Sequence, residues 1–218
     1  MATIESLTLE VADTEAAHRF YTTAFGLDTQ LRLRPSQAPS TGFRGFTLSL
    51  VVSQPADVNA FVDAAVAAGA TTLKPAAKSL WGYGGVVQAP DGTIWQLASS
   101  SKKDTGPATR KFDELVLLLG VADVTASKRF YVDRGLTVAK GFGSKYVEFA
   151  TGSGPVKLAL YKRRGLAKVA GVSPEGTGSH CLAVGGDIGS FTDPDGFVWE
   201  DAPSAPTLAQ LAEGIETQ

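Results

Sequence analysis

The chain has 218 residues, of which 44% are hydrophobic and 19% charged, and a formal net charge of −2. This composition is typical of a globular protein with one sizeable core or two small ones, and it lacks the basic surplus that binds nucleic acid. A single cysteine excludes an intramolecular disulfide, and the longest unbroken apolar run, "LVLLL", is too short to cross a bilayer. We therefore expect a cytoplasmic protein with neither nucleic acid nor a membrane as partner.

The first hundred residues predict alternating strands and helices. Apolar and polar residues alternate over 6–11, which indicates a half-buried strand, and Asp13 or Thr14 then caps a helix that ends at Gly26. Further extended stretches are expected at the ranges 28–34, 43–52 and 83–98. A second helix at 56–68 fits the helical spacing of its apolar residues.

The second half starts in the same way and then differs. A strand and a helix are predicted over 112–134, followed by strands near 136–140, 145–150 and 156–161. The segment 162–180, "KRRGLAKVAGVSPEGTGSH", predicts a short helical piece and a loop in place of the helix at 56–68. This asymmetry indicates that the two halves have different tasks.

Two motifs occur twice in the same order. "VADTEAAHRFY" (11–21) and "VADVTASKRFY" (121–131) share seven of eleven residues, and a Pro-Asp-Gly turn recurs in "APDGTIWQLAS" (89–99) and "DPDGFVWEDAP" (193–203). The repeats predict a first module at 1–100, a linker at 101–111, a second module at 112–203 and a C-terminal tail at 204–218 with a short helix.

These motifs, within "LTLEVADTEAAHRFYTTAFGL", "LVLLLGVADVTASKRFYVDRGL", "WGYGGVVQAPDGTIWQL" and "FTDPDGFVWED", resemble the vicinal oxygen chelate superfamily. This superfamily contains glyoxalase I, bleomycin-resistance proteins and extradiol dioxygenases. The resemblance implies an α+β fold with two tandem βαβββ modules, whose mixed sheets pair to form a cleft for a ligand or a metal.

The resemblance also implies four metal-ligand positions, which this chain fills with Ser6, Gln96, Val116 and Glu200. Only Glu200 is a good ligand for a divalent metal, and Gln96 is a tolerable one. We therefore expect no metal and no other cofactor. Strand parity leaves a second possibility open, that Glu10 and Glu200 form a pair of carboxylates on one face.

The remaining candidates are residues that can hold an organic ligand. Val116 and Leu118 stand where the first repeat has Ser6 and Thr8, which predicts one apolar and one polar wall. Aromatic residues can stack on a planar ligand, and His180 follows a glycine-rich loop, whereas Trp95 and Trp199 are expected in the core. The glycines of "WGYGG" fit either a strand bend or the rim of a pocket. The predicted ligand-binding residues are Ser6, Thr8, Phe46, Trp81, Tyr83, Gln96, Val116, Leu118, Tyr146, Tyr161, His180 and Glu200.

The sequence favours a metal-free protein of the glyoxalase/bleomycin-resistance type that binds a hydrophobic or aromatic small molecule in the inter-module cleft. The alternative is a glyoxalase-like lyase or isomerase that uses Glu200 as its catalytic residue, helped by Gln96, Glu10 or His180 with an atypical or absent metal. A scaffold with a vestigial pocket is a third possibility. Monomer and homodimer both remain open, because one chain carries both modules.

Overall fold

The computed structural model describes residues 2–27, 30–150, 152 and 154–201. The predicted tail at 204–218 lies outside these residues. The helices of the described part are α1 (Thr14–Phe25), α2 (Pro55–Ala67), α3 (Val124–Val132) and α4 (Arg163–Ala170). None of them is long and apolar enough to cross a membrane.

The strands of the first repeat are β1 (Ile4–Val11), β2 (Leu31–Pro35), β3 (Ser40–Gly42), β4 (Phe46–Val51), β5 (Thr71–Ser79), β6 (Gly82–Gln88) and β7 (Ile94–Ser99). Those of the second are β8 (Glu114–Val121), β9 (Thr137–Phe142), β10 (Tyr146–Ala150), β11 (Val156–Lys162), β12 (Gly176–Gly178), β13 (Leu182–Gly186), β14 (Phe191–Thr192) and β15 (Val198–Asp201).

Local signals in the sequence set the ends of the repeated helix. The Asp13 carboxylate accepts a hydrogen bond from the backbone N–H of Ala16 at 2.8 Å, and Gly26 ends α1 with a φ of 67°. Asp123 caps α3 in the same way. Strand β5 was not predicted, because its lysine, proline and alanine residues lack a period-two apolar pattern.

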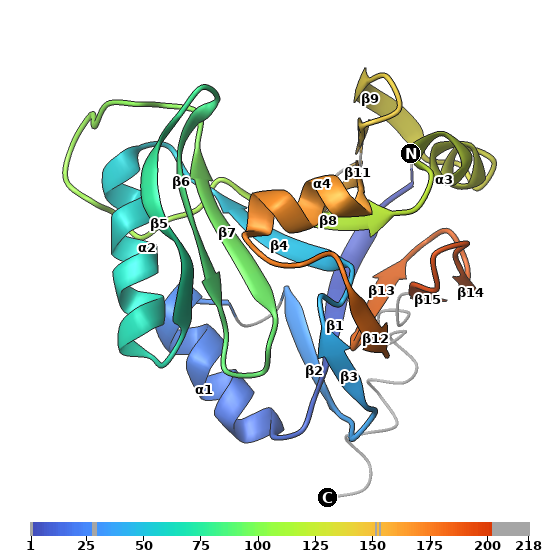
Figure 1. Cartoon of the computed structure of the whole chain (residues 1–218), viewed down its shortest axis with the longest axis horizontal. Helices are drawn as coiled ribbons and strands as arrows, with labels where there is room; N and C mark the ends of the chain where they lie inside the picture. Colours follow the sequence, from blue (N-terminus) through green and yellow to red (C-terminus); the bar gives the residue numbers. More distant parts are fainter. Residues whose placement is uncertain (1, 28–29, 151, 153, 202–218) are drawn as a thin grey trace, which may run out of the picture.

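Both repeats contribute to each large sheet. A five-stranded sheet has the order β14-β15-β13-β1-β2, and an eight-stranded sheet has the order β5-β6-β7-β4-β8-β11-β10-β9 (Figure 1). Each half of the eight-stranded sheet is a βαβββ run, β4-α2-β5-β6-β7 in the first repeat and β8-α3-β9-β10-β11 in the second. The α+β fold of tandem βαβββ modules with mixed sheets is thus confirmed.

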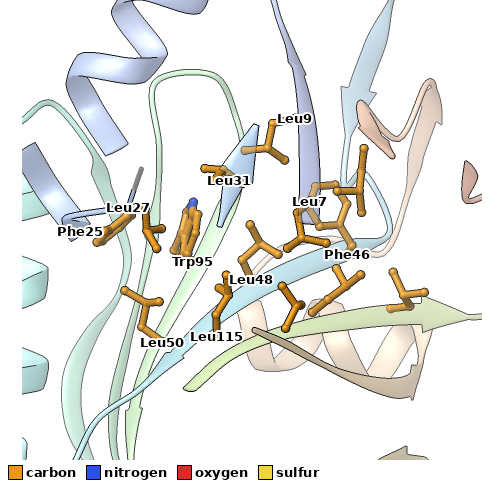
Figure 2. Close-up of a cluster of buried hydrophobic side chains, with 14 of the residues drawn as sticks. Leu7, Leu9, Phe25, Leu27, Leu31, Phe46, Leu48, Leu50, Trp95 and Leu115 are labelled. Carbon is orange, nitrogen blue, oxygen red and sulfur yellow. The ribbon is translucent and has the colours of Figure 1, made fainter. Parts of the chain in front are cut away.

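The main hydrophobic core lies between the two sheets and helices α1, α2 and α3. Leu7 and Leu9 of β1 meet Phe46, Leu48 and Leu50 of β4 in this core (Figure 2). Because successive side chains of a strand point to opposite faces, the alternate residues of each strand point away from the core. Each sheet therefore offers one outward face on which a ligand can bind.

The two recurring motifs hold each other in place in both repeats. The Tyr21 hydroxyl donates to Asp91 at 2.6 Å, and the Tyr131 hydroxyl donates to Asp193 at 2.6 Å. Burial raises the pKa of both tyrosines, and the adjacent aspartate raises it further, so both hydroxyls stay protonated. Each tyrosine also packs on a buried tryptophan, Trp95 or Trp199, and both tryptophans lie in the core as predicted.

Removing the Tyr131 hydroxyl should destabilise the protein. The hydroxyl donates to Asp193 and accepts from the indole N–H of Trp199 at 3.2 Å, so Tyr131→Phe leaves two buried polar groups without this partner. We expect the free energy of unfolding, measured by urea denaturation, to fall by about 1–3 kcal/mol. Tyr83→Phe removes an exposed hydrogen bond to Asn59 and should change it by less than about 0.5 kcal/mol. Equal losses in the two variants would contradict the role of the buried pair.

Candidate ligand-binding site

The largest cavity described, about 890 Å³, lies on the outward face of the eight-stranded sheet. It is lined by the β5–β6 hairpin of the first repeat, the β9–β10 hairpin of the second, and parts of β7, β11 and α4. Strands β5 and β9 are the two edges of the sheet, so the sheet curves until its edges approach the same space. Five predicted residues line this cavity, namely Trp81, Tyr83, Gln96, Tyr146 and Tyr161.

Aromatic side chains from both repeats form the walls. Tyr146 and Tyr161 are register partners on β10 and β11, and their ring centroids lie 4.8 Å apart in a T-shaped arrangement. Phe142, next to Tyr146, is 56% exposed, and Trp81 on the opposite hairpin is 83% exposed. Large apolar side chains thus remain open to solvent on both sides of the cavity mouth, where a planar ligand could cover them.

The tyrosine hydroxyls are hydrogen-bond donors at physiological pH. Burial raises the pKa of Tyr146, and its hydrogen bond of 2.8 Å to Glu148 raises it further. Burial also raises the pKa of Tyr161, with a smaller effect of the Glu148 charge. The hydroxyl of Tyr161 forms no hydrogen bond with any other described residue, so it is available to a ligand in the cavity.

Gln96 and the glycines of "WGYGG" shape the first-repeat side of the cavity. The Gln96 amide donates to the Thr47 hydroxyl at 2.8 Å, which fixes its orientation. Gly82 has a φ of 146°, and a Cβ atom there would lie 2.0 Å from the carbonyl oxygen of Ser99. Gly82 also lines the cavity together with Gly84 and Gly85, so these glycines serve both as a close strand contact and as the pocket rim.

The structure corrects the prediction for Val116 and Leu118. Both lie on the outward face of β8, where α4 packs (orange helix in Figure 1); Leu118 and Leu166 belong to one buried cluster, and Val116 packs against it. They form a second apolar cluster instead of a ligand wall. From Leu117 to Val121, strand β8 is therefore buried on both faces, in keeping with its unbroken run "LVLLL".

Hydrogen bonds with other segments fix α4 in this position. Arg163 donates to the carbonyl oxygens of Phe43 at 2.6 Å and Pro174 at 3.0 Å. At the other end, the Lys74 ammonium donates to the carbonyls of Lys168 and Val169, at 2.6 and 2.7 Å. Cations at these last carbonyls stabilise the C-terminus of a helix. Helix α4 thereby closes one side of the cavity with Val169.

Phe46 is corrected as well. It is 2% exposed and points into the central core with Leu48 and Leu50, away from the cavity (Figure 2). The alternation in "FTLSLV" could have predicted this orientation of Phe46. Thr47 and Ser49 are the polar residues that share the outward face with Gln96, so Phe46 must point to the opposite face.

His180 also lies outside the cavity. Its Nδ1 atom forms a hydrogen bond with the carbonyl oxygen of Arg44, its Nε2 atom lies 3.1 Å from the carbonyl oxygen of Asp195, and its ring stacks on Phe197 at 4.0 Å. It borders a separate cavity of about 450 Å³ with Arg44 and Arg163. His180 thus connects the loop at Arg44 in the first repeat with the turn at Asp195 in the second.

Ser6, Thr8 and Glu200 belong to the outward face of the five-stranded sheet. Ser6 and Glu200 both pair in register with Gly185, and Thr8 pairs with Ala183 on the same strand, β13. None of the three lines the large cavity. Sequence alternation identified their face correctly, but it could not show that this face belongs to a different sheet from that of Gln96.

An arginine that the sequence reading missed joins two carboxylates on this second face. Arg34 of β2 donates to Glu200 at 2.8 Å and to Glu10 at 2.7 Å. These bonds, that of Glu200 first, raise the pKa of the Arg34 guanidinium. Glu10 and Glu200 are thus close in space, as strand parity allowed, but a cation already lies between them.

The residues at the implied metal positions do not fit a divalent metal. Ser6 and Glu200 lie on the five-stranded sheet, whereas Gln96 and Val116 flank Ser49 on the eight-stranded sheet. An open metal site usually has about three anionic or imidazole ligands. Neither pair meets this requirement, and no cluster of at least three His, Cys, Asp or Glu residues suited to a metal occurs in the described part of the chain.

Replacing Arg34 should reveal repulsion between the two carboxylates. Arg34→Met removes two charge-assisted hydrogen bonds and leaves Glu10 beside Glu200. Because the three groups are partly exposed, we expect a loss of only about 1 kcal/mol in the free energy of unfolding at low salt and pH 7. The loss should shrink in about 1 M salt. Arg19→Met, which breaks an exposed pair with Glu15, is the control and should have no measurable effect. Wild-type stability of Arg34→Met at low salt would contradict the argument.

Comparison with known proteins supports the same architecture. No family model and no curated protein matches the chain. Among solved structures, glyoxalase I from Zea mays is similar with a TM-score of 0.59 and 16% identity over 91% of each chain. A candidate dioxygenase from Bacillus subtilis has a TM-score of 0.54 and 12% identity over 88% of this chain and 71% of its own. Identities this low show the fold and not the reaction. The chain therefore shares the fold of these solved structures, in which the present chain forms tandem βαβββ runs.

Proposed function

We propose that this protein binds a hydrophobic or aromatic small molecule in the cavity between its β5–β6 and β9–β10 hairpins, without a metal and without altering the ligand. The observation that carries this proposal is the aromatic lining of the cavity, which comes from both repeats. The cavity volume of about 890 Å³ falls within the range of about 300–1,000 Å³ that is usual for small-molecule sites.

The polar groups of the cavity favour binding over turnover. Its lining includes no Asp, Glu, His or Cys, so it offers none of the usual carboxylate, imidazole or thiol groups for acid–base or nucleophilic catalysis. Burial raises the pKa of Tyr161, whose neutral hydroxyl is open to a ligand, and the Gln96 amide is fixed by Thr47. These groups can orient a bound compound by hydrogen bonds while the aromatic rings stack on it.

A glyoxalase-like lyase or isomerase remains the second candidate, because the structure gathers Glu10 and Glu200 on one outward face. As a general base, either carboxylate would have to take a proton while it is bonded to Arg34. The Arg34 hydrogen bonds occupy one oxygen atom of each carboxylate, which a substrate proton would also have to reach. This arrangement makes the binding function the better supported of the two.

Binding of a neutral aromatic probe tests the proposal. We expect N-phenyl-1-naphthylamine to bind at one equivalent, with enhanced fluorescence, and to be recovered unchanged. Trp81→Ala should weaken its affinity about tenfold, because truncating a contacting tryptophan commonly costs more than 1 kcal/mol. Leu80→Ala is the matched control, since Leu80 is 80% exposed beside Trp81 but does not line the cavity. Equal effects of the two variants, or chemical change of the probe, would contradict the proposal.

Metal titration separates the two candidate functions. We expect one equivalent of zinc, nickel, manganese or iron(II) to leave the melting temperature unchanged, since neither pair of implied positions forms a ligand set. A stabilising metal whose effect disappears in Glu200→Ala would favour the enzyme instead.

A further inference from the structure

The two hairpins that border the cavity carry an excess of positive charge. The β5–β6 hairpin, residues 71–88, contains Lys74 and Lys78 and no acidic residue. The β9–β10 hairpin, residues 137–150, contains Lys140, Lys145 and one acidic residue, Glu148. The chain as a whole has a net charge of −2, so this local excess opposes its overall charge.

Two of these lysines are available to a ligand. Lys74 donates to the last carbonyls of α4 and so has a structural role. Lys78 and Lys140 both line the cavity, one on each hairpin, and both are exposed. Neither forms an ion pair with a carboxylate of any described residue. Two ammonium groups without a carboxylate partner thus border the same aromatic space from opposite sides.

The one acidic residue of these two hairpins, Glu148, is not part of the cavity lining. Glu148 is the register partner of Lys140 on β10, but its carboxylate accepts the hydrogen bond of Tyr146 and does not line the cavity. Lys140 instead lies over the ring of Phe142, with its Nζ atom 5.4 Å from the ring centroid. The lining therefore combines aromatic rings with ammonium groups and contains no carboxylate.

On the basis of the binding function proposed above, we infer that the ligand is an aromatic anion, a planar ring system with a carboxylate, sulfonate or phosphate group. The rings lie between Trp81 and the Tyr146–Tyr161 pair, and the anionic group lies at the mouth, between Lys78 and Lys140. The free hydroxyl of Tyr161 donates to a polar atom on the ring system. Attraction by the two lysines also raises the rate at which an anion enters the cavity.

Two probes of nearly equal shape isolate the contribution of the charge. The first, 8-anilino-1-naphthalenesulfonate, is N-phenyl-1-naphthylamine with an added sulfonate, and the second is the neutral parent. We compare the wild type with Lys78→Gln/Lys140→Gln, and use Lys103→Gln, an exposed lysine of the linker, as control. Each probe's affinity is expressed relative to its own wild-type value, which cancels the different hydrophobicity of the probes.

We expect the double variant to bind the sulfonate probe about tenfold more weakly, since each exposed charge contributes about three- to fivefold. Its affinity for the neutral probe should stay within about twofold of the wild type, and the control should change neither. The sulfonate affinity of the wild type should also fall as salt rises. If the neutral probe binds but the lysine variant leaves the sulfonate affinity unchanged, the inference fails and the binding function stands. If neither probe binds, the binding function fails and this inference fails with it.

Discussion

The main hydrophobic core, enclosed by the two sheets and helices α1, α2 and α3, is the constraint on which the rest of this structure depends. This core covers one face of the central strands. Leu7 and Leu9 of β1 are therefore buried in the same cluster as Leu48 and Leu50 of β4. Residues that can meet a ligand are confined to the alternate positions, which point outward. Because the two sheets face each other across the core, their outward faces lie on opposite sides of it. The four implied metal positions are thereby divided into two pairs that cannot cooperate.

The two outward faces have different contents. On the five-stranded sheet, Arg34 forms ion pairs with Glu10 and Glu200 and supplies a permanent cation between them. On the eight-stranded sheet, α4 covers the centre, where Val116 and Leu118 lie, and leaves the space between the edge hairpins open. Ion pairs with Arg34 occupy the glutamates of one face, and α4 covers Val116 and Leu118 on the other, so the implied positions form no metal-ligand set. The large aromatic cavity lies beside α4, between the edge hairpins.

In both repeats, a tyrosine of the helix donates a hydrogen bond to an aspartate of the turn, but the two aspartates are not at equivalent positions. Tyr21 donates to Asp91 of the first Pro-Asp-Gly turn, whereas Tyr131 donates to Asp193, two residues before the equivalent Asp195. Asp195 instead accepts from Ser127 and from the backbone of Ala122. Each repeat thus fixes its helix on its hairpin through a buried tyrosine, an aspartate and a tryptophan. This shared architecture accounts for the recurrence of both motifs without any shared ligand chemistry.

The sequence by itself determined much of the local structure. The start of the helix at Asp13 or Thr14, its end at Gly26, the core positions of Trp95 and Trp199 and the tandem fold follow from capping, periodicity and repeated motifs. It also identified Trp81, Tyr83, Gln96, Tyr146 and Tyr161, which the structure brings to one cavity. Only the tertiary structure decided which strands share a sheet, that α4 covers Val116 and Leu118, and that Arg34 reaches Glu200 across 166 positions of the chain. The reason is physical: alternation along a strand distinguishes its two faces, but the identity of what covers each face depends on contacts between segments that are far apart in the sequence.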